Sequence, residues 1–219
     1  MLIALTGLLS PAEVGAIRDA AGKLEFGDGR ATAGRRARAV KANDQALPSP
    51  ARDAILEKAR RALLAHPVFQ AAARPEKLTP LLLSRYRVGQ TYGLHVDDAL
   101  MQGLRTDLSF TLFLSDPATY DGGALEIEDN YAPREIRLNA GDLILYPSTT
   151  LHRVTPVTRG ERLAIVGWAQ SFIRGQEQRE VLFDLDQSIA TLEQEGAQRV
   201  LLDRLSRARS NLLRLWAGA

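Results

Sequence analysis

The sequence predicts an α+β protein that is mainly β, with a double-stranded β-helix (jelly roll) as its core. Short apolar, β-branched or aromatic runs alternate with turn-forming residues between Leu78 and Phe172, and helical apolar spacing occurs on either side. A length of 219 residues suits one domain with small appendages. We therefore expect an N-terminal helical and strand region on the core (1–78), the jelly roll itself (79–175) and a C-terminal helical hairpin (176–219).

The N-terminal region begins with a predicted short strand, Leu2–Leu5. A helix start follows, with a serine cap, a proline at the first helical position and a glutamate at the third: Ser10, Pro11 and Glu13. This helix should end near Ala21. Phe26–Arg30 is rich in glycine and predicts a turn, and Pro48–Ala65 predicts a second helix with one face on the core.

The core should consist of seven or eight short antiparallel strands, which is typical of a jelly roll. Turn formers separate the runs, among them Asp116-Pro117, Asp121–Gly123 and Asn139–Asp142. In such a fold, residues distant in sequence converge in the mouth between two sheets. The predicted strands are Leu81–Arg87, Leu108–Leu114, Ala124–Glu128, Glu135–Leu138, Leu143–Tyr146, His152–Val157 and Arg162–Phe172.

The C-terminal region predicts two amphipathic helices, Gln176–Glu193 and Gln198–Trp216, separated at Gly196. Two roles remain open for their leucine-rich stripes. The helices could cover the outside of a sheet, or they could offer a face to a second copy of the chain and form a homodimer.

Composition excludes several classes of protein. A net charge of +2 and a pI of about 9.1 are too mild to indicate a nucleic-acid partner. The absence of cysteine excludes disulfides and thiolate metal sites and fits a cytoplasmic protein. No apolar run approaches the roughly 20 residues of a membrane span, and no signal peptide precedes the first strand. The basic run Arg35–Lys41 predicts a solvated face or, alternatively, a positive rim that attracts an anionic ligand.

A candidate metal site can be found because the chain has only three histidines. His95 and Asp97 are two residues apart, so in extended structure their side chains point to the same side. His152 follows an apolar strand signal and is the better third ligand, whereas His66 precedes Pro67 and should cap or pack a helix. Two histidines and one carboxylate with open positions are the facial triad of non-haem Fe(II) oxygenases.

Two further charged residues lie near this pattern. Arg162 stands ten residues after His152 at the start of a predicted strand, and its guanidinium suits bidentate capture of a carboxylate. Asp98 should be a supporting or solvated group, because adjacent strand residues point apart.

The chain resembles the Fe(II)- and 2-oxoglutarate-dependent dioxygenases, specifically the prolyl-4-hydroxylase-like branch and its PKHD-type hydroxylases. The resemblance spans roughly residues 79–173. It implies that His95, Asp97 and His152 ligate Fe(2+), that Arg162 holds the distal carboxylate of 2-oxoglutarate, and that Tyr86 lines the cosubstrate pocket. The residues that carry it are Tyr86, His95-Val96-Asp97, Asp121–Leu125, Gly141-Asp142, His152 and Arg162.

The resemblance implies an oxidoreductase that uses O2 and 2-oxoglutarate as cosubstrates and releases succinate and CO2, with L-ascorbate (vitamin C) as a candidate reductant. The substrate could be a peptidyl proline, a free amino acid or another small molecule. Two other classes stay open. One is a non-catalytic sensor that binds iron and 2-oxoglutarate. The other is a zinc hydrolase on the same triad, in which Arg162 would have no evident role.

Overall fold

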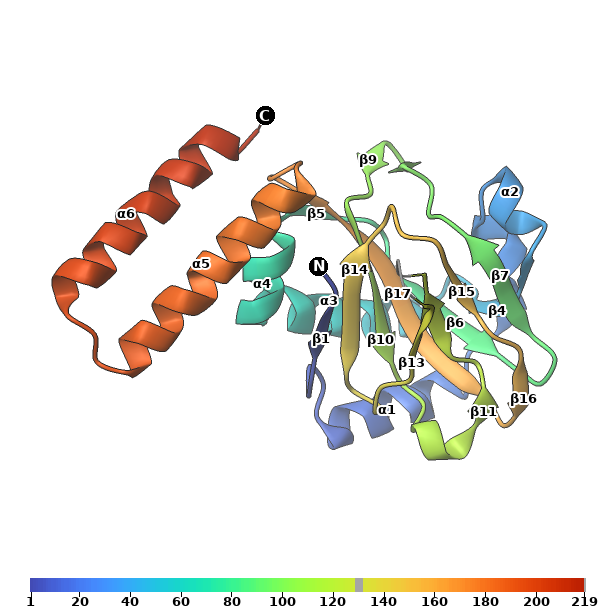
Figure 1. The fold of residues 1–219 in the computed structure, drawn as a ribbon. Coiled ribbons are helices and arrows are strands. Elements are labelled where there is room, and N and C mark those ends of the chain that lie inside the picture. Colours follow the sequence, from blue (N-terminus) through green and yellow to red (C-terminus); the bar gives the residue numbers. More distant parts are fainter. Residues whose placement is uncertain (129–131, 219) are drawn as a thin grey trace.

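The computed structural model describes residues 1–128 and 132–218, and two antiparallel sheets form its centre (Figure 1). The larger sheet has eight strands. Seven of them follow one another side by side, and the eighth, β5 (Pro75–Leu78), pairs with strand β17. Its order is β1 (Ile3–Leu5), β14 (Leu143–Pro147), β10 (Leu108–Phe113), β17 (Arg162–Ser171), β6 (Leu82–Tyr86), β4 (Asp44–Ala46) and β2 (Phe26–Asp28).

The smaller sheet faces the larger one and carries His95 and His152. Two short ladders, β11 (Asp121–Gly122) with β16 (Val157–Arg159) and β8 (Leu100–Met101) with β9 (Leu104–Arg105), complete the β structure of the described residues. The two facing sheets confirm the predicted jelly roll. The order of the smaller sheet is β13 (Arg134–Ile136), β12 (Leu125–Ile127), β15 (His152–Val154), β7 (Thr91–His95) and β3 (Lys41–Ala42).

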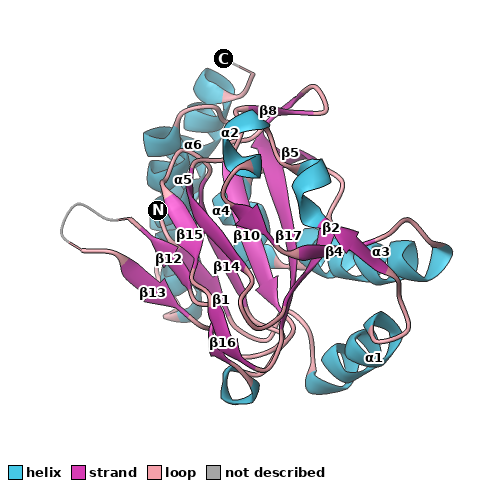
Figure 2. Cartoon of the chain, turned by 90° about the vertical axis from the view of Figure 1, so that its right-hand side faces the viewer, coloured by secondary structure: helices cyan, strands magenta, loops and turns pink. Residues whose placement is uncertain are grey.

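Helices cover the larger sheet on the face away from the smaller one (Figure 2). The main core lies between this sheet and α1, α3 and α4, with Leu63, Phe69 and Phe110 fully buried there. A second cluster, which includes Phe113 and Tyr146, lies between the sheets. The helices are α1 (Pro11–Ala21), α2 (Arg35–Arg38), α3 (Pro50–Ala65), α4 (Pro67–Ala73), α5 (Gln176–Gln194) and α6 (Arg199–Trp216), with 3-10 turns at Gly29–Thr32 and Pro117–Thr119.

The predicted start of α1 is confirmed in atomic detail. The Ser10 hydroxyl accepts the Glu13 backbone N–H at 3.3 Å, and the Glu13 carboxylate accepts the Ser10 backbone N–H at 2.9 Å. This reciprocal pair satisfies two N–H groups that the first helical turn leaves free. At α3 the serine cap is Ser49, so the helix begins two residues later than the sequence pattern predicts.

Several segments differ from the predictions, and three of them show the physical reasons. Phe26–Arg30 is not only a turn, because its first three residues pair with β4. The run His152–Val157 is broken after β15, since Pro156 has no N–H for the ladder, and the chain resumes as β16 beside β11. Helix α4 has only seven residues, too few to show a helical apolar period in the sequence. Helical residues slightly outnumber strand residues in the described part of the chain, so the protein is mixed rather than mainly β.

The C-terminal hairpin stands to one side of the β core (Figure 1). Helix α5 packs mainly on α4, with Leu182 and Ile189 buried, and α6 packs along α5. The end of α6 returns to the start of the hairpin, where Ala217 bridges Ile173.

Strands from residues 1–78 join both sheets, and the division of the chain into domains stays a prediction. Within the described residues, no helix has the length and apolar character needed to cross a membrane.

Candidate metal and cosubstrate site

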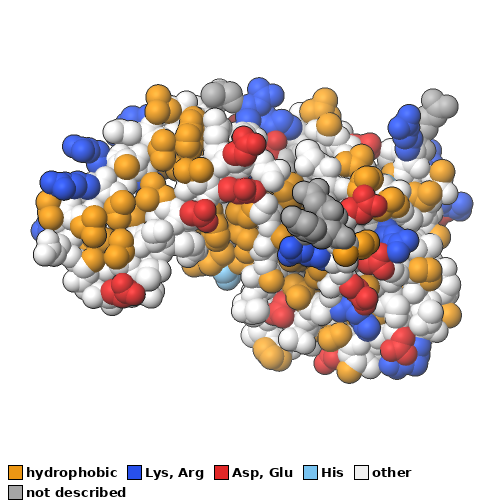
Figure 3. All heavy atoms as spheres, in the orientation of Figure 1, with side chains coloured by type: hydrophobic (Ala, Val, Ile, Leu, Met, Phe, Trp, Pro, Cys, Tyr) orange, Lys and Arg blue, Asp and Glu red, His pale blue; other side chains and the backbone are white. Residues whose placement is uncertain are grey.

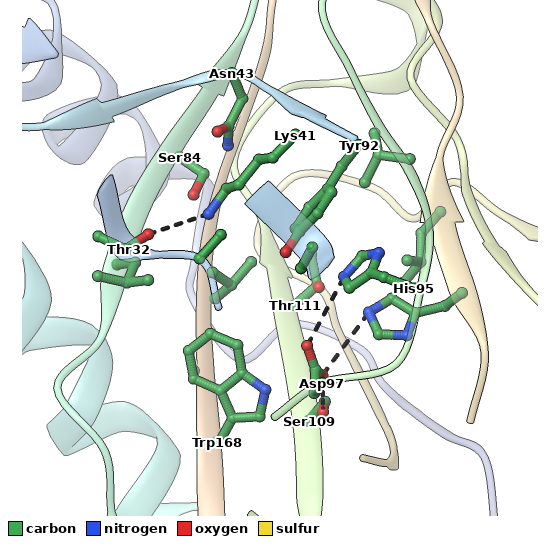
Figure 4. Close-up of a pocket in the computed structure, with 18 of the residues that line it drawn as sticks. Thr32, Lys41, Asn43, Ser84, Tyr92, His95, Asp97, Ser109, Thr111 and Trp168 are labelled. Carbon is green, nitrogen blue, oxygen red and sulfur yellow. Dashed lines mark hydrogen bonds and ion pairs between the residues drawn. The ribbon is translucent and has the colours of Figure 1, made fainter. Parts of the chain in front are cut away.

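The sheet register brings His95 and His152 together, although 56 residues separate them in the sequence. His95 ends β7, His152 begins β15, and the two are direct Cα partners in the antiparallel ladder. Asp97 follows β7 and turns back toward both imidazoles (Figure 4). One Asp97 oxygen lies 3.8 Å from His95 Nε2, and the other lies 3.8 Å from His152 Nε2.

Backbone carbonyls fix the orientation of both imidazole rings. His95 Nδ1 lies 2.7 Å from the carbonyl oxygen of Gly93, and His152 Nδ1 lies 3.0 Å from that of Thr150. Each Nδ1–H therefore donates to a carbonyl, and each Nε2 is left with a free lone pair facing Asp97. This is the tautomer and the orientation that metal-ligating histidines commonly adopt.

Hydroxyl groups from the larger sheet orient the Asp97 carboxylate. Ser109 Oγ lies 2.5 Å from Asp97 Oδ2 and 2.8 Å from Ser148 Oγ. Because a hydroxyl has one proton, Ser109 donates it to the carboxylate and can accept from Ser148. Sequence reasoning missed Ser109, but a signal was present: polar Ser109 and Thr111 alternate with apolar residues along β10.

Burial keeps the imidazole of His95 neutral. Desolvation, followed by the neighbouring His152, lowers the pKa of His95 from 6.5 to about 4. A neutral imidazole is the form that binds a metal ion. Protein nitrogen and oxygen ligands lie about 2.0–2.2 Å from a first-row divalent ion, so two ligands of one ion are at most about 4.4 Å apart. The two 3.8 Å separations fall within this limit, and the donor set fits an iron site.

Arg162 is the most buried charged group of this region, with 1% of its surface exposed. It begins β17 opposite Tyr86 of β6, and its guanidinium lies between two aromatic rings, 5.3 Å from the Tyr86 centroid and 5.2 Å from that of Phe113. No carboxylate of the described residues forms an ion pair with it, and its Nε has no hydrogen-bond partner among them. A buried cation without a counter-ion is costly unless a ligand supplies one.

One cavity contains the triad and Arg162. The empty space around these residues is about 720 Å³ with the open mouth included. Tyr86 lines this cavity, and burial raises the pKa of Tyr86 to about 12, so its hydroxyl stays protonated. The indole of Trp168 forms part of the wall, and its buried Nε1 has no partner among the described residues.

The other charged and histidine residues singled out in the sequence differ in their position relative to the cavity. His66 lies between α3 and α4, outside the cavity, as the sequence indicates. Asp98 is exposed at the cavity edge and does not join the triad. The basic run is divided: Arg36 and Arg38 are exposed, whereas Lys41 is 7% exposed and lines the cavity. Lys41 is thus a second buried cation that sequence reasoning did not single out.

Comparisons with known proteins agree with this geometry. Residues 81–170 match the 2OG-Fe(II) oxygenase superfamily, and residues 176–218 match the PKHD-type hydroxylase C-terminal domain. A PKHD-type hydroxylase of Maricaulis maris is 49% identical over 217 residues, with 99% of each chain covered. Another, from Parvibaculum lavamentivorans, is 47% identical over 218 residues, again with 99% of each chain covered.

Solved structures share the fold at low sequence identity. A prolyl-4-hydroxylase of Pseudomonas putida matches with a TM-score of 0.56 at 21% identity, covering 78% of this chain and 92% of the other. A Trichoplax adhaerens prolyl hydroxylase matches with a TM-score of 0.57 at 16% identity, covering 83% and 86%. Near-complete coverage at almost half identity decides the family: the chain is a PKHD-type hydroxylase of the 2OG-Fe(II) oxygenase superfamily.

Proposed function

We propose that this hydroxylase holds Fe(II) with His95, Asp97 and His152. The observation that carries the proposal is the convergence of three prearranged donors on one point, with both Nδ1 atoms anchored by backbone and Asp97 held by Ser109. Three protein ligands leave the other positions of an octahedral ion open, as an oxygenase requires.

We propose that Arg162 binds the distal carboxylate of 2-oxoglutarate, with Tyr86 beside it. The support is the buried, uncompensated guanidinium in the same cavity as the triad. A planar guanidinium can take a carboxylate through two parallel N–H donors. The aromatic rings of Tyr86 and Phe113 exclude water around the pair, which strengthens it.

Bound iron and 2-oxoglutarate would supply the oxygen chemistry, in which O2 is consumed, 2-oxoglutarate becomes succinate and CO2, and the substrate is hydroxylated. The chain itself orients these groups and shields them from water. We propose L-ascorbate as the reductant that keeps the iron in the Fe(II) state. A peptidyl proline, a free amino acid or another small molecule remains the proposed range of substrates.

The test is turnover of 2-oxoglutarate without substrate. Purified protein with Fe(II), O2 and 2-oxoglutarate should form succinate slowly, and chelation of the iron should stop it. His95→Ala, Asp97→Ala and His152→Ala should each abolish this turnover while the far-UV circular dichroism stays unchanged. His66→Ala is the matched control, because His66 lies outside the cavity.

Three results would contradict the proposal. Loss of iron binding in His66→Ala but not in His152→Ala would refute the ligand assignment. A wild-type protein that binds iron and 2-oxoglutarate but forms no succinate would be a sensor. One that binds zinc and hydrolyses a substrate without consuming 2-oxoglutarate would be a hydrolase.

We further propose that the C-terminal hairpin forms a homodimer. Helix α6 has no buried residue among those described, and hydrophobic side chains gather on the hairpin in Figure 3, at the place where Figure 1 shows α5 and α6. Exposed apolar surface of this kind commonly marks an interaction site. The exposed large apolar residues of the hairpin are Val181, Val200, Leu201 and Leu215.

A further inference from the structure

The cavity contains a second buried cation, Lys41, that the proposed iron and 2-oxoglutarate contacts do not use. Strand β3 pairs with β7 so that Lys41 stands directly opposite Tyr92. The ammonium lies 5.0 Å from the centroid of the Tyr92 ring, and the His95 imidazole stacks on the same ring at 3.6 Å. Figure 4 shows Lys41 and His95 on opposite sides of Tyr92, so one aromatic ring separates the ammonium from the triad.

Lys41 has hydrogen-bond donors to spare. Among the described residues its Nζ has one hydrogen-bond partner, Thr32 Oγ1 at 3.1 Å, and no carboxylate within ion-pair distance. An ammonium carries three N–H groups, so two remain for a ligand. Desolvation lowers the pKa of Lys41 from 10.5 to about 8, in spite of opposing attraction from Asp97 and Asp28. The protein therefore holds the Lys41 ammonium in a buried position that favours the neutral amine.

A second donor stands in the same part of the cavity. The single proton of Thr32 Oγ1 has two acceptors within reach, Gln45 Oε1 at 2.8 Å and the Gly29 carbonyl oxygen at 3.1 Å, and neither contact uses the amide N–H groups of Gln45. Gln45 Nε2 is buried, has no partner among the described residues, and belongs to a cavity-lining side chain. Buried polar groups are normally hydrogen-bonded, so an unpartnered amide donor in the same cavity as an ammonium without a counter-ion points to a missing acceptor.

Counting charges indicates what that acceptor is. In the proposed site 2-oxoglutarate places one carboxylate at the iron and the other at Arg162, and both are then accounted for. Lys41 remains without a counter-ion on the far side of Tyr92. We propose that Lys41 and Gln45 bind a carboxylate of the primary substrate, so that this hydroxylase acts on a substrate bearing an acidic group. The inference rests on the function proposed above and extends it to the substrate.

Anaerobic calorimetry on the full-length protein tests the subsite. Fe(II) and 2-oxoglutarate are titrated first, and then benzoate, its neutral isostere benzamide, and the peptide acetyl-Ala-Glu-Ala-amide. The wild type should bind benzoate or the peptide about tenfold or more tightly than benzamide, as expected for a hydrogen bond to a charged group. Binding of benzoate identifies a small acid as the source of the carboxylate, and binding of the peptide alone identifies an acidic side chain.

Substitutions at Lys41 distinguish binding of a substrate carboxylate from binding of the cosubstrate. Lys41→Met, which keeps the length of the side chain, should abolish the preference, and Lys41→Arg should retain part of it. Arg36→Gln is the matched control, because it removes an exposed charge from the same basic run. If Lys41→Met weakens binding of 2-oxoglutarate instead of benzoate or the peptide, Lys41 serves the cosubstrate and the proposal is overturned.

Thermal unfolding adds a readout that a structural lysine would not give. A lysine kept for binding costs stability in the empty site, so Lys41→Met should melt at the same temperature as the wild type or higher. A lower melting temperature would identify Lys41 as structural and overturn the proposal. If the wild type fails to bind 2-oxoglutarate with Fe(II), the proposed function fails. If it binds 2-oxoglutarate but prefers neither acid to benzamide, the subsite alone fails.

Discussion

Two residues, Arg162 and Lys41, carry unneutralised charge inside one cavity, and their chemistry differs. Arg162 is held between aromatic rings and presents a rigid planar fork, which suits a ligand of fixed geometry. Lys41 presents a point charge on a flexible stem, which tolerates ligands of varied shape. The difference agrees with an invariant cosubstrate at Arg162 and a separate substrate group at Lys41.

Arg162→Lys should raise the 2-oxoglutarate concentration needed for half-maximal turnover more than it lowers metal affinity. Lysine keeps the charge but loses the bidentate pair, and truncation of a buried charge pair costs about 2–5 kcal/mol. Steady-state succinate formation measures the first quantity, and iron titration measures the second. Unchanged dependence on 2-oxoglutarate in Arg162→Ala would refute the cosubstrate assignment.

The stability of the metal-free protein should depend on pH through Lys41. Its folded pKa of about 8 lies below the ordinary 10.5, so between these values the unfolded chain binds a proton that the folded chain has released. Stability from this group therefore rises with pH, and the destabilisation is complete below pH 8. Relative to Lys41→Met, the wild type should gain about 3 kcal/mol or less between pH 8 and 10.5.

Urea unfolding of both proteins from pH 7 to pH 10 measures this gain. The buried tyrosines Tyr86, Tyr92 and Tyr146 also titrate abnormally, because burial raises the pKa of each, but they are present in both proteins and cancel in the difference. A stability difference that stays constant over this range would show that Lys41 is not the group that loses its proton.

The site was only partly predictable at the residue scale. His95, Asp97 and His152 could be found because imidazoles are rare in this chain and side chains two apart on a strand share a face. Ser109 and Lys41 could not be assigned, since their role depends on pairing between strands distant in sequence. In the sequence Lys41 is the end of a basic run, and only its pairing opposite Tyr92 takes it into the cavity.

At the scale of elements, strands with strong local signals were predicted within a few residues, and those defined by their partners were missed. The apolar runs that became β10, β14 and β17 carry their own pattern. Strands β3 and β4 are two and three residues long and polar, and they exist because β7 and β6 offer free edges. These short strands nevertheless position Lys41 and Gln45 in the cavity.

The close approach of β3 and β7 depends on a glycine. A Cβ on Gly93 would lie 2.8 Å from the Cβ of Val40, so Gly93→Ala should force the strands apart. Overpacking of this kind costs about 1–3 kcal/mol, and Val40→Gly, which removes the Val40 Cβ itself, should relieve the clash in the double variant. Urea unfolding of the single and double variants measures the coupling.

The control is Gly15→Ala in α1, where an added Cβ has no neighbour within 4 Å and should stabilise the helix slightly. Additive effects of Gly93→Ala and Val40→Gly would show that the two side chains do not compete for the same space.

For the whole molecule, the two-sheet core and the hairpin are joined by ion pairs as well as by apolar packing. Arg74, whose side chain is 5% exposed, pairs with Asp186 of α5 at 2.5 Å, and the N-terminal amine pairs with Glu180 at the same distance. Removing residues 176–219 would remove the ion-pair partner of Arg74 and uncover the face of α4 on which α5 packs. Deletion should therefore lower both solubility and stability. Substitutions on the exposed face of α6 test assembly without removing the packing of α5 on α4.

The hairpin should make the full-length chain a dimer at micromolar concentration. Leu201 and Leu215 are 42% and 70% exposed, and a separation of fourteen residues is close to four helical turns, so both lie on one side of α6. Introducing charge there, as Leu201→Glu with Leu215→Glu, should convert the dimer to a monomer, because an ionised carboxylate cannot be buried without a partner. Static light scattering gives the mass directly.

Val88→Glu is the control, since Val88 is 63% exposed but lies between β6 and β7, and it should leave the dimer intact. A monomeric wild type would reject the dimer and leave the packing of α5 on α4 unaffected, because Leu182 and Ile189 are buried within a single chain.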